Sequence, residues 1–122
     1  MTESEKKKTQ SAIDIATGHF KDRLAGDMLC YHCEEWDMDI YYKATASLMV
    51  ENKIMSLQQQ GKTAEALVES IIAKALNKDG KKLFKTTDMP EFLHSVDPNV
   101  IIKVATKLNN ASADTVEEIG KN

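Results

Sequence analysis

The sequence has few aromatic residues, few cysteines and no long apolar run. One tryptophan, three tyrosines and three phenylalanines are too few for a platform that stacks single-stranded nucleic acid. No apolar run approaches the roughly 20 residues that cross a membrane. The N-terminal residues lack the apolar segment of a signal peptide, so we expect a cytoplasmic protein. In the cytoplasm, Cys30 and Cys33 are expected to be reduced thiols.

What the sequence does contain is typical of one globular domain. The chain has 122 residues, of which 42% are hydrophobic and 29% are charged. A chain of this length buries enough surface to fold alone. The net charge is −3 with both signs interleaved, which favours solubility and argues against a dedicated nucleic-acid surface.

The pattern of apolar residues predicts a mainly α fold of about five helices, with a short β-hairpin near residues 28–42. Residues 1–10 are polar and predict a flexible N-terminal arm. Residues 11–110 form the predicted helical domain. Residues 111–122 have few large apolar side chains and predict a C-terminal tail that is partly disordered.

The first predicted elements are a helix and the hairpin. Ile13, Phe20 and Leu24 have helical spacing, and Gly26 is a suitable stop. Residues 28–42 lose that spacing and gather aromatic residues, which favours two short strands. A lone hairpin is marginal in water, so we expect it to pack on the helices or on a neighbouring subunit.

Two central helices follow. The first spans residues 43–60, with one apolar face marked by Ala44, Leu48 and Met55 and widened by Val50, Ile54 and Leu57. Gly61 ends it, and Thr63 is the expected N-cap of the next helix. The clearest amphipathic pattern in the chain belongs to that second helix: Leu67, Val68, Ile71, Ile72, Ala75 and Leu76.

The last third of the chain reads as a turn and two helices. Residues 77–80 are turn formers, and Asp88 and Glu91 have capping-box spacing for a short helix. Asp97 and Pro98 are expected at the start of the final helix, which ends at residues 109–110. Its apolar face consists of Val100, Ile101, Val104, Ala105 and Leu108.

Two short motifs suggest chemistry and are better explained without it. Gly61, Lys62 and Thr63 resemble the end of a phosphate-binding loop, but Ser56 stands where a glycine is required and a helix precedes them. We therefore predict a joint between two helices. Cys30 and Cys33 form a C-x-x-C pair enclosing a histidine, with a zinc ligand set completed only by distant residues, His19 and His94.

Nothing else in the sequence indicates catalysis, a cofactor or a metal, so we expect a protein that is not an enzyme. The second of the central helices has too little positive charge to be a DNA recognition helix. A basic run at Lys78, Lys81, Lys82 and Lys85 is typical of a solvated turn. Six methionines suit an adaptable protein-binding surface, although Met49 and Met55 fit a core equally well.

The order of these features resembles the tail assembly chaperone family of long-tailed, lambda-like bacteriophages. The similarity covers roughly residues 11–110. Its most specific part is Asp79-Gly80-Lys81-Lys82-Leu83-Phe84, followed by Thr87-Asp88, Phe92-Leu93 and a last helix ending in Leu108-Asn109. Lys43 stands where the family often has arginine, and the pair of cysteines is not expected of the family.

The resemblance implies a protein that binds the tape measure protein, keeps it soluble and helps to recruit tail tube subunits. It implies self-association, no nucleotide, no nucleic acid and no membrane, in the host cytoplasm and not in the mature virion. It also implies a longer frameshifted product that binds the tail tube protein, with Gly120-Lys121 as a candidate slippage site.

Two alternatives stay open: a small helical regulator that binds DNA or another protein, and a metal-binding protein that uses Cys30 and Cys33. The sequence does not say which residues contact a partner.

Overall fold

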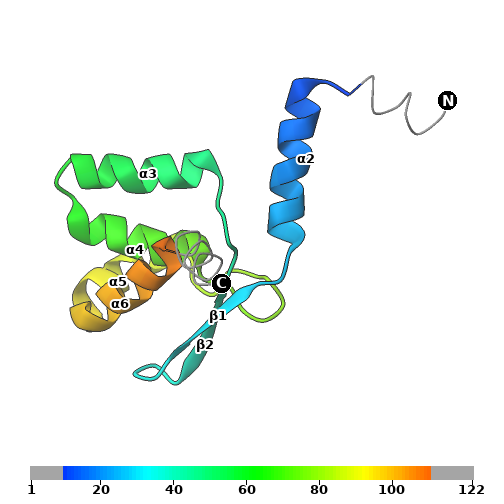
Figure 1. Cartoon of the computed structure of the whole chain (residues 1–122). Coiled ribbons are helices and arrows are strands. Elements are labelled where there is room, and N and C mark those ends of the chain that lie inside the picture. The colour runs from blue at the N-terminus through cyan, green and yellow to red at the C-terminus, as the bar shows by residue number, and fades with distance from the viewer. Residues whose placement is uncertain (1–9, 111–122) are drawn as a thin grey trace, which may run out of the picture.

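A computed structural model describes residues 10–110, which form five α-helices, one short 3-10 helix and one β-hairpin (Figure 1). The elements follow the order α2 (Ala12–Ala25), β1 (Leu29–Cys33), β2 (Met38–Tyr42), α3 (Leu48–Gln59), α4 (Thr63–Lys74), η1 (Thr86–Asp88), α5 (Met89–Ser95) and α6 (Pro98–Asn109). The predicted mainly α fold with a hairpin is confirmed. The predicted flexible arm, apart from Gln10, and the predicted C-terminal tail lie outside the described residues.

Helix α4 is the centre of the helical body. It packs against α3 on one side and against α5 and α6 on the other. Ile71 is fully buried on α4, and Val104 and Leu108 meet it from α6. The apolar face predicted for α6 is confirmed, because all five of its residues are buried: Val100, Ile101, Val104, Ala105 and Leu108.

The hairpin adds one face to the same core. Its antiparallel register pairs Tyr31 with Ile40 and Cys33 with Met38. Side chains alternate between the two faces of a strand, so one face is apolar and the other carries His32 and Asp39. Cys33, Ile40 and Tyr42 are buried against the helices. The expectation that the hairpin packs on the helices is therefore correct.

The chain after α4 runs beside the hairpin. The amide of Leu76 donates to the Tyr41 carbonyl at 2.7 Å, and the amide of Tyr41 donates to the Leu76 carbonyl at 2.9 Å. Ala75 and Leu76 were predicted to continue the helix and instead leave it, while staying buried. The turn predicted at residues 77–80 is confirmed, with the Asn77 side chain accepting from two amides and Gly80 at φ 81°.

The prediction for α3 was wrong in its start and in part of its apolar face; the part that includes Val50, Ile54 and Leu57 is correct, because Ile54 is buried and the other two are half-buried. The helix starts at Leu48, because residues 43–47 lead away from β2 without helical structure and the Ser47 hydroxyl accepts from the Val50 amide. Leu48 is 81% exposed and Met55 is 50% exposed, whereas Ile54 is buried. Leu48 and Met55 have helical spacing, but they lie at the surface. The side of α3 that contains Ile54 packs on the core instead.

One predicted cap was wrong: Lys62, not Thr63, is the N-cap of α4, and it makes no side-chain cap bond. Asp88 is the N-cap residue of α5 as predicted, but its carboxylate makes no cap bond there and accepts instead from the Lys85 amide across η1 at 2.8 Å. Asp97 does cap α6 as predicted, and Gly61 ends the α3 turn at φ 79°.

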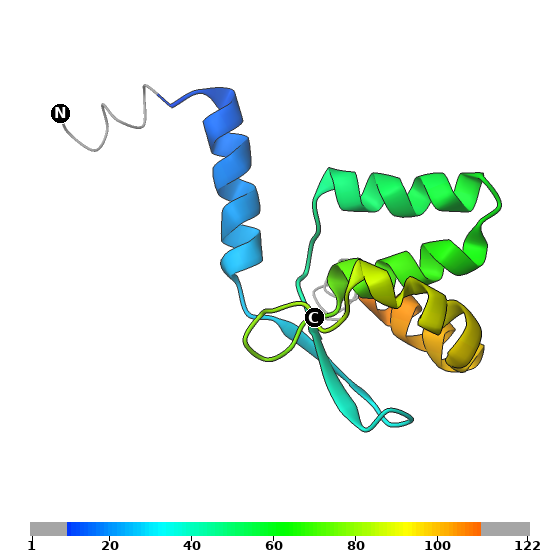
Figure 2. The same cartoon turned by 180° about the vertical axis from the view of Figure 1, so that it is seen from behind.

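Helix α2 stands apart from the helical body in both views (Figures 1 and 2). Ser11 is its N-cap, with a hydroxyl that accepts from the Asp14 amide, and Gly26 follows its last residue, as predicted. None of its residues is buried. A separate helix of this length is marginal in water, so α2 has a strong physical reason to pack against a partner.

Candidate binding groove beside α2

A groove of about 510 Å³ lies between α2 and the helical body. Its walls come from α2, residues 43–47, the start of α3 and the C-terminal ends of α4 and α6. Apolar side chains make up one part of the lining: Phe20, Leu24, Ala44, Ala46, Val50, Ala73, Leu76 and Leu108. Polar and charged side chains make up the rest: Lys43, Thr45, Ser47, Glu51, Lys74, Lys82 and Asn109.

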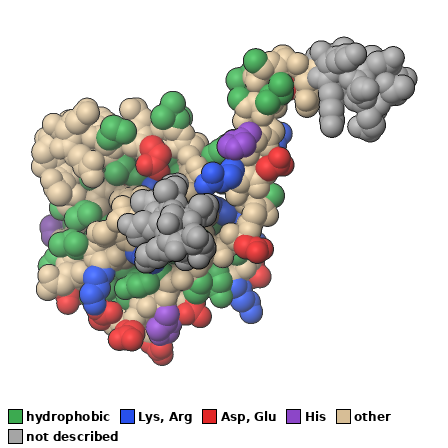
Figure 3. Space-filling view, in the orientation of Figure 1, with side chains coloured by type: hydrophobic (Ala, Val, Ile, Leu, Met, Phe, Trp, Pro, Cys, Tyr) green, Lys and Arg blue, Asp and Glu red, His purple; other side chains and the backbone are tan. Residues whose placement is uncertain are grey.

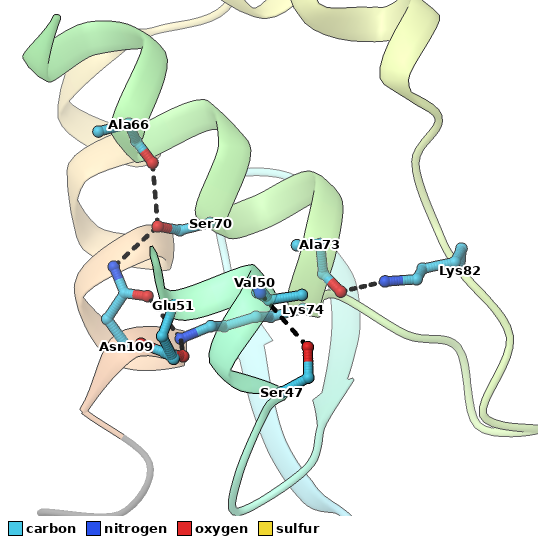
Figure 4. Close-up of polar contacts among 9 residues, drawn as sticks. All are labelled: Ser47, Val50, Glu51, Ala66, Ser70, Ala73, Lys74, Lys82 and Asn109. Carbon is cyan, nitrogen blue, oxygen red and sulfur yellow. Dashed lines mark hydrogen bonds and ion pairs between the residues drawn. The ribbon is translucent and has the colours of Figure 1, made fainter. Parts of the chain in front are cut away.

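A polar network fixes the helix ends that line this groove (Figure 4). The Lys74 ammonium lies 2.6 Å from a Glu51 carboxylate oxygen and donates to Asn109 Oδ1 at 2.9 Å. Asn109 Nδ2 donates to Ser70 Oγ at 2.9 Å, and Ser70 Oγ donates to the Ala66 carbonyl. The Lys74 side chain is only 10% exposed. These bonds tie α3, α4 and α6 together, so this wall of the groove is pre-formed.

Lys82 makes a separate contact at the C-terminal end of α4. Its ammonium donates to the carbonyl of Ala73, one of the last carbonyls of α4 (Figure 4). These carbonyls have no partner within the helix, and a cation beside them is favoured by the helix dipole. The basic run predicted as a solvated turn therefore has one member with a structural contact.

The opposite wall of the groove is α2, which is less firmly held. Phe20 and Leu24 are half-buried where they face the groove, and Ile13 and Ile15 are 68% and 58% exposed. A groove with apolar residues in its lining and polar residues around them suits the apolar face of an amphipathic helix. Such a ligand would cover apolar surface of α2 and α3 together.

Further apolar side chains are exposed on α3. Leu48 is 81% exposed and Met49 is 79% exposed. Hydrophobic side chains lie at the surface over α3 and over the upper part of α2 (Figure 3). Methionine side chains adapt to differently shaped partners. The prediction that methionines form an adaptable surface fits Met49 and Met55, while the alternative placement of these two in the core was wrong.

The structure separates the predicted metal ligands. Cys30 and Cys33 are three residues apart on β1 and so lie on opposite faces; Cys30 is exposed and Cys33 is buried. His19 is on α2 and His94 is on α5, in different parts of the fold. Among residues 10–110, no group of three or more His, Cys, Asp or Glu side chains is placed to hold a metal ion.

The other motifs are joints and surface pairs. Residues 61–63 lie at the joint between α3 and α4, as predicted, and the element directly before them is the helix α3 and not a strand. Helix α4 lies between α3, α5 and α6, with Glu69 and Ser70 buried, so it does not present a free recognition helix. Its Glu69 carboxylate lies 3.2 Å from the Lys53 ammonium, which joins α4 to α3.

Three ion pairs involve residues of the hairpin, and the longest joins His32 Nε2 to Asp37 Oδ1 at 3.8 Å. His32 Nδ1 lies 2.7 Å from Asp39 Oδ1 across the strand pair, and this hydrogen bond raises the pKa of His32 above its ordinary value. The Lys103 ammonium on α6 lies 2.5 Å from the Glu35 carboxylate in the hairpin turn. This bond lowers the pKa of Glu35 and raises the pKa of Lys103. These contacts give His32, Asp39 and Glu35 a structural role.

No family model, no curated protein and no solved structure matches this chain. Among the described residues, no helix is both long enough and apolar enough to span a membrane.

Proposed function

We propose that this protein is a tail assembly chaperone of a long-tailed bacteriophage, and that it binds apolar helical segments of the tape measure protein. The observation that carries the proposal is the groove between α2 and the helical body, together with the helix α2 that packs so little on its own fold. A chaperone for a long helical client needs an apolar surface that is uncovered until the client arrives. The ordered motifs of the sequence give the proposal its family.

The proposed binding mode places one client helix along the groove. Its apolar face would contact Phe20 and Leu24 from α2 and Val50 from α3. Its polar side would face Lys43, whose side chain also lines the groove. Helix-in-groove recognition of this kind reads apolar residues spaced three and four apart. Long helical clients contain many such segments, which supports binding by several copies along one client.

The proposal also includes the other properties that the resemblance to tail assembly chaperones implies. The protein acts without catalysis and without a cofactor, in the host cytoplasm, and leaves before the virion is complete. Copies of the chain self-associate on the client. A longer frameshifted form recruits the tail tube protein. The regulatory and metal-binding alternatives have less support, because α4 is enclosed and the cysteines lie on opposite faces of β1.

Co-expression with the tape measure protein tests the proposal. We expect the two proteins to purify together and the tape measure protein to be soluble only in the presence of this chain. A matched pair of variants places the contact: Val50→Asp in the groove should abolish co-purification, whereas Lys62→Asp at the exposed α3–α4 joint should not. A tape measure protein that is soluble alone and never co-purifies would contradict the proposal.

A further inference from the structure

A second pocket, of about 430 Å³, lies between the hairpin and α5, away from the groove. Aromatic and aliphatic side chains make up most of its lining, with two carboxylates: Trp36, Met38, Phe84, Asp88, Glu91, Phe92 and Val96. None of these residues lines the groove beside α2. The two sites are therefore separate, and they use different helices.

An aromatic trio forms the base of this pocket. Phe84 meets Phe92 edge to face, with ring centroids 4.9 Å apart, and Trp36 lies 6.3 Å from Phe84. Phe92 is buried in the core, while Trp36 and Phe84 are only half-buried. Edge-to-face packing holds the rings in fixed positions. The pocket therefore offers a pre-formed apolar surface that costs little to organise on binding.

Two carboxylates line this surface, and others lie in the turn beside it. Asp88 and Glu91 line it at the start of α5, and Glu34 and Asp37 lie in the turn that contains Trp36. The Asp37 side chain is 97% exposed, and its carboxylate lies 3.8 Å from His32 Nε2. Acidic side chains gather over the hairpin end of the molecule (Figure 3). The Lys103 ammonium is paired with Glu35. Lys85 follows Phe84 directly in the sequence.

We propose that the Trp36 pocket is a second docking site, which binds a helical protein segment carrying a large aliphatic anchor flanked by lysine or arginine. The anchor would pack on Trp36 and Phe84, and the flanking cations would face Asp88 and Glu91. The groove beside α2 has lysines in its lining instead. The two sites thus differ in the charges of their linings, because the groove also contains Glu51 and the Trp36 pocket contains no lysine. The pocket extends the proposed function by a second and independently testable site.

Trp36 is the only tryptophan in the chain, so its fluorescence reports on this pocket alone. The probe is a synthetic helical peptide of about 18 residues, long enough to be helical, with leucines on one face, lysines beside them and no tryptophan. We expect a saturable shift in Trp36 emission. The same peptide with glutamate in place of each lysine should bind at least about tenfold more weakly, because the charges now repel.

Variants of the full chain locate the charge effect. Glu91→Lys should weaken binding of the lysine peptide by about five- to tenfold at low salt, because attraction at the rim becomes repulsion. Asp22→Lys makes the same change in net charge on the exposed surface of α2 and should leave binding within about twofold. Circular dichroism and the unfolding midpoint check that both variants fold.

Several outcomes would overturn the proposal. One is peptide binding, measured by anisotropy of a labelled peptide, without any change in Trp36 emission. Equal binding of the two peptides, or equal effects of Glu91→Lys and Asp22→Lys, would show that the carboxylates of the pocket do not select a basic segment. A shift in Trp36 emission on raising the protein concentration without peptide would assign the pocket to a second copy of this chain. None of these tests involves the tape measure protein, so their failure is distinct from failure of the proposed function.

Discussion

Helices α6 and α2 are similar in length, and each has apolar residues at helical spacing, but they differ in what those residues contact. In α6, which has 12 residues, five apolar side chains are buried in the core. In α2, which has 14 residues, none is buried. Helical spacing therefore predicts that a helix forms, whereas the partner of its apolar face depends on the rest of the fold.

The difference divides the molecule into a part that is stable by itself and a part that is prepared for a partner. The body around α4 has a fully buried core and a polar network joining three helices. The α2 segment has apolar side chains at its surface and faces a groove. We infer that the body provides folding stability and that α2 provides binding surface.

The largest expected effect that tests this division is in the core. Ile71→Ala on α4 should lower the free energy of unfolding by about 3 kcal/mol, because it removes fully buried methyl groups and leaves a cavity. Ile13→Ala on α2 removes the same atoms from a residue that is 68% exposed. This substitution should change the free energy of unfolding by less than about 0.5 kcal/mol. Urea denaturation of the two variants measures both. Equal losses would mean that α2 belongs to the folded core.

A smaller effect is expected in the polar network beside the groove. Lys74→Met should lower the free energy of unfolding by about 1 kcal/mol, because Glu51 and Asn109 lose a partner but remain within reach of water. Lys62→Met removes a lysine from the exposed joint and should have little effect. If both variants unfold at the same urea concentration as the wild type, the network does not hold the helix ends in place.

A smaller and local effect is expected in α2. Gly18 lies within this helix, and a Cβ added there meets no atom within 4 Å. Gly18→Ala should favour the α2 helix by about 0.5–1 kcal/mol through helix propensity. The helical signal in circular dichroism should increase, while the midpoint of global unfolding stays unchanged. A clear shift of that midpoint would show that α2 unfolds together with the body.

The smallest effect concerns the exposed pair His32 and Asp39. Asp39 raises the pKa of His32 above 6.5, so the pair stabilises the folded hairpin fully below about pH 6.5 and loses its effect as pH rises through the folded-state pKa. Asp39→Asn should lower the pKa of His32, as measured by NMR titration of the imidazole. An unchanged pKa would show that the contact does not persist in solution.

The sequence correctly predicted the elements whose residue pattern allows only one interpretation. The buried face of α6, the hairpin and the turn at residues 77–80 were all correct. In α3 the prediction was correct for Ile54, which is buried, and wrong for Leu48 and Met55, which have helical spacing but are exposed. Periodicity alone does not tell which apolar residues of a helix contact the core.

The groove was not predictable from the sequence, because its parts are distant along the chain. Lys74 and Asn109 are 35 residues apart, and nothing local indicates that they meet. Phe20 and Leu24 were placed correctly on a helix, but their approach to residues 43–47 depends on the path of the hairpin between them. The only feature of the sequence that pointed to the groove was the pair of apolar side chains, Phe20 and Leu24, on a short helix.

Hydrogen exchange of the protein alone and in the presence of the tape measure protein tests the groove most directly as the client site. We expect α2 amides in the free protein to exchange much faster than those of α4 and α6, because local opening of α2 exposes little buried surface. With the tape measure protein bound, the amides of α2 and of the start of α3 should become protected. If α2 is already as protected as α4 in the free protein, or if its exchange does not change when the client binds, the assignment of the groove as the client site is wrong.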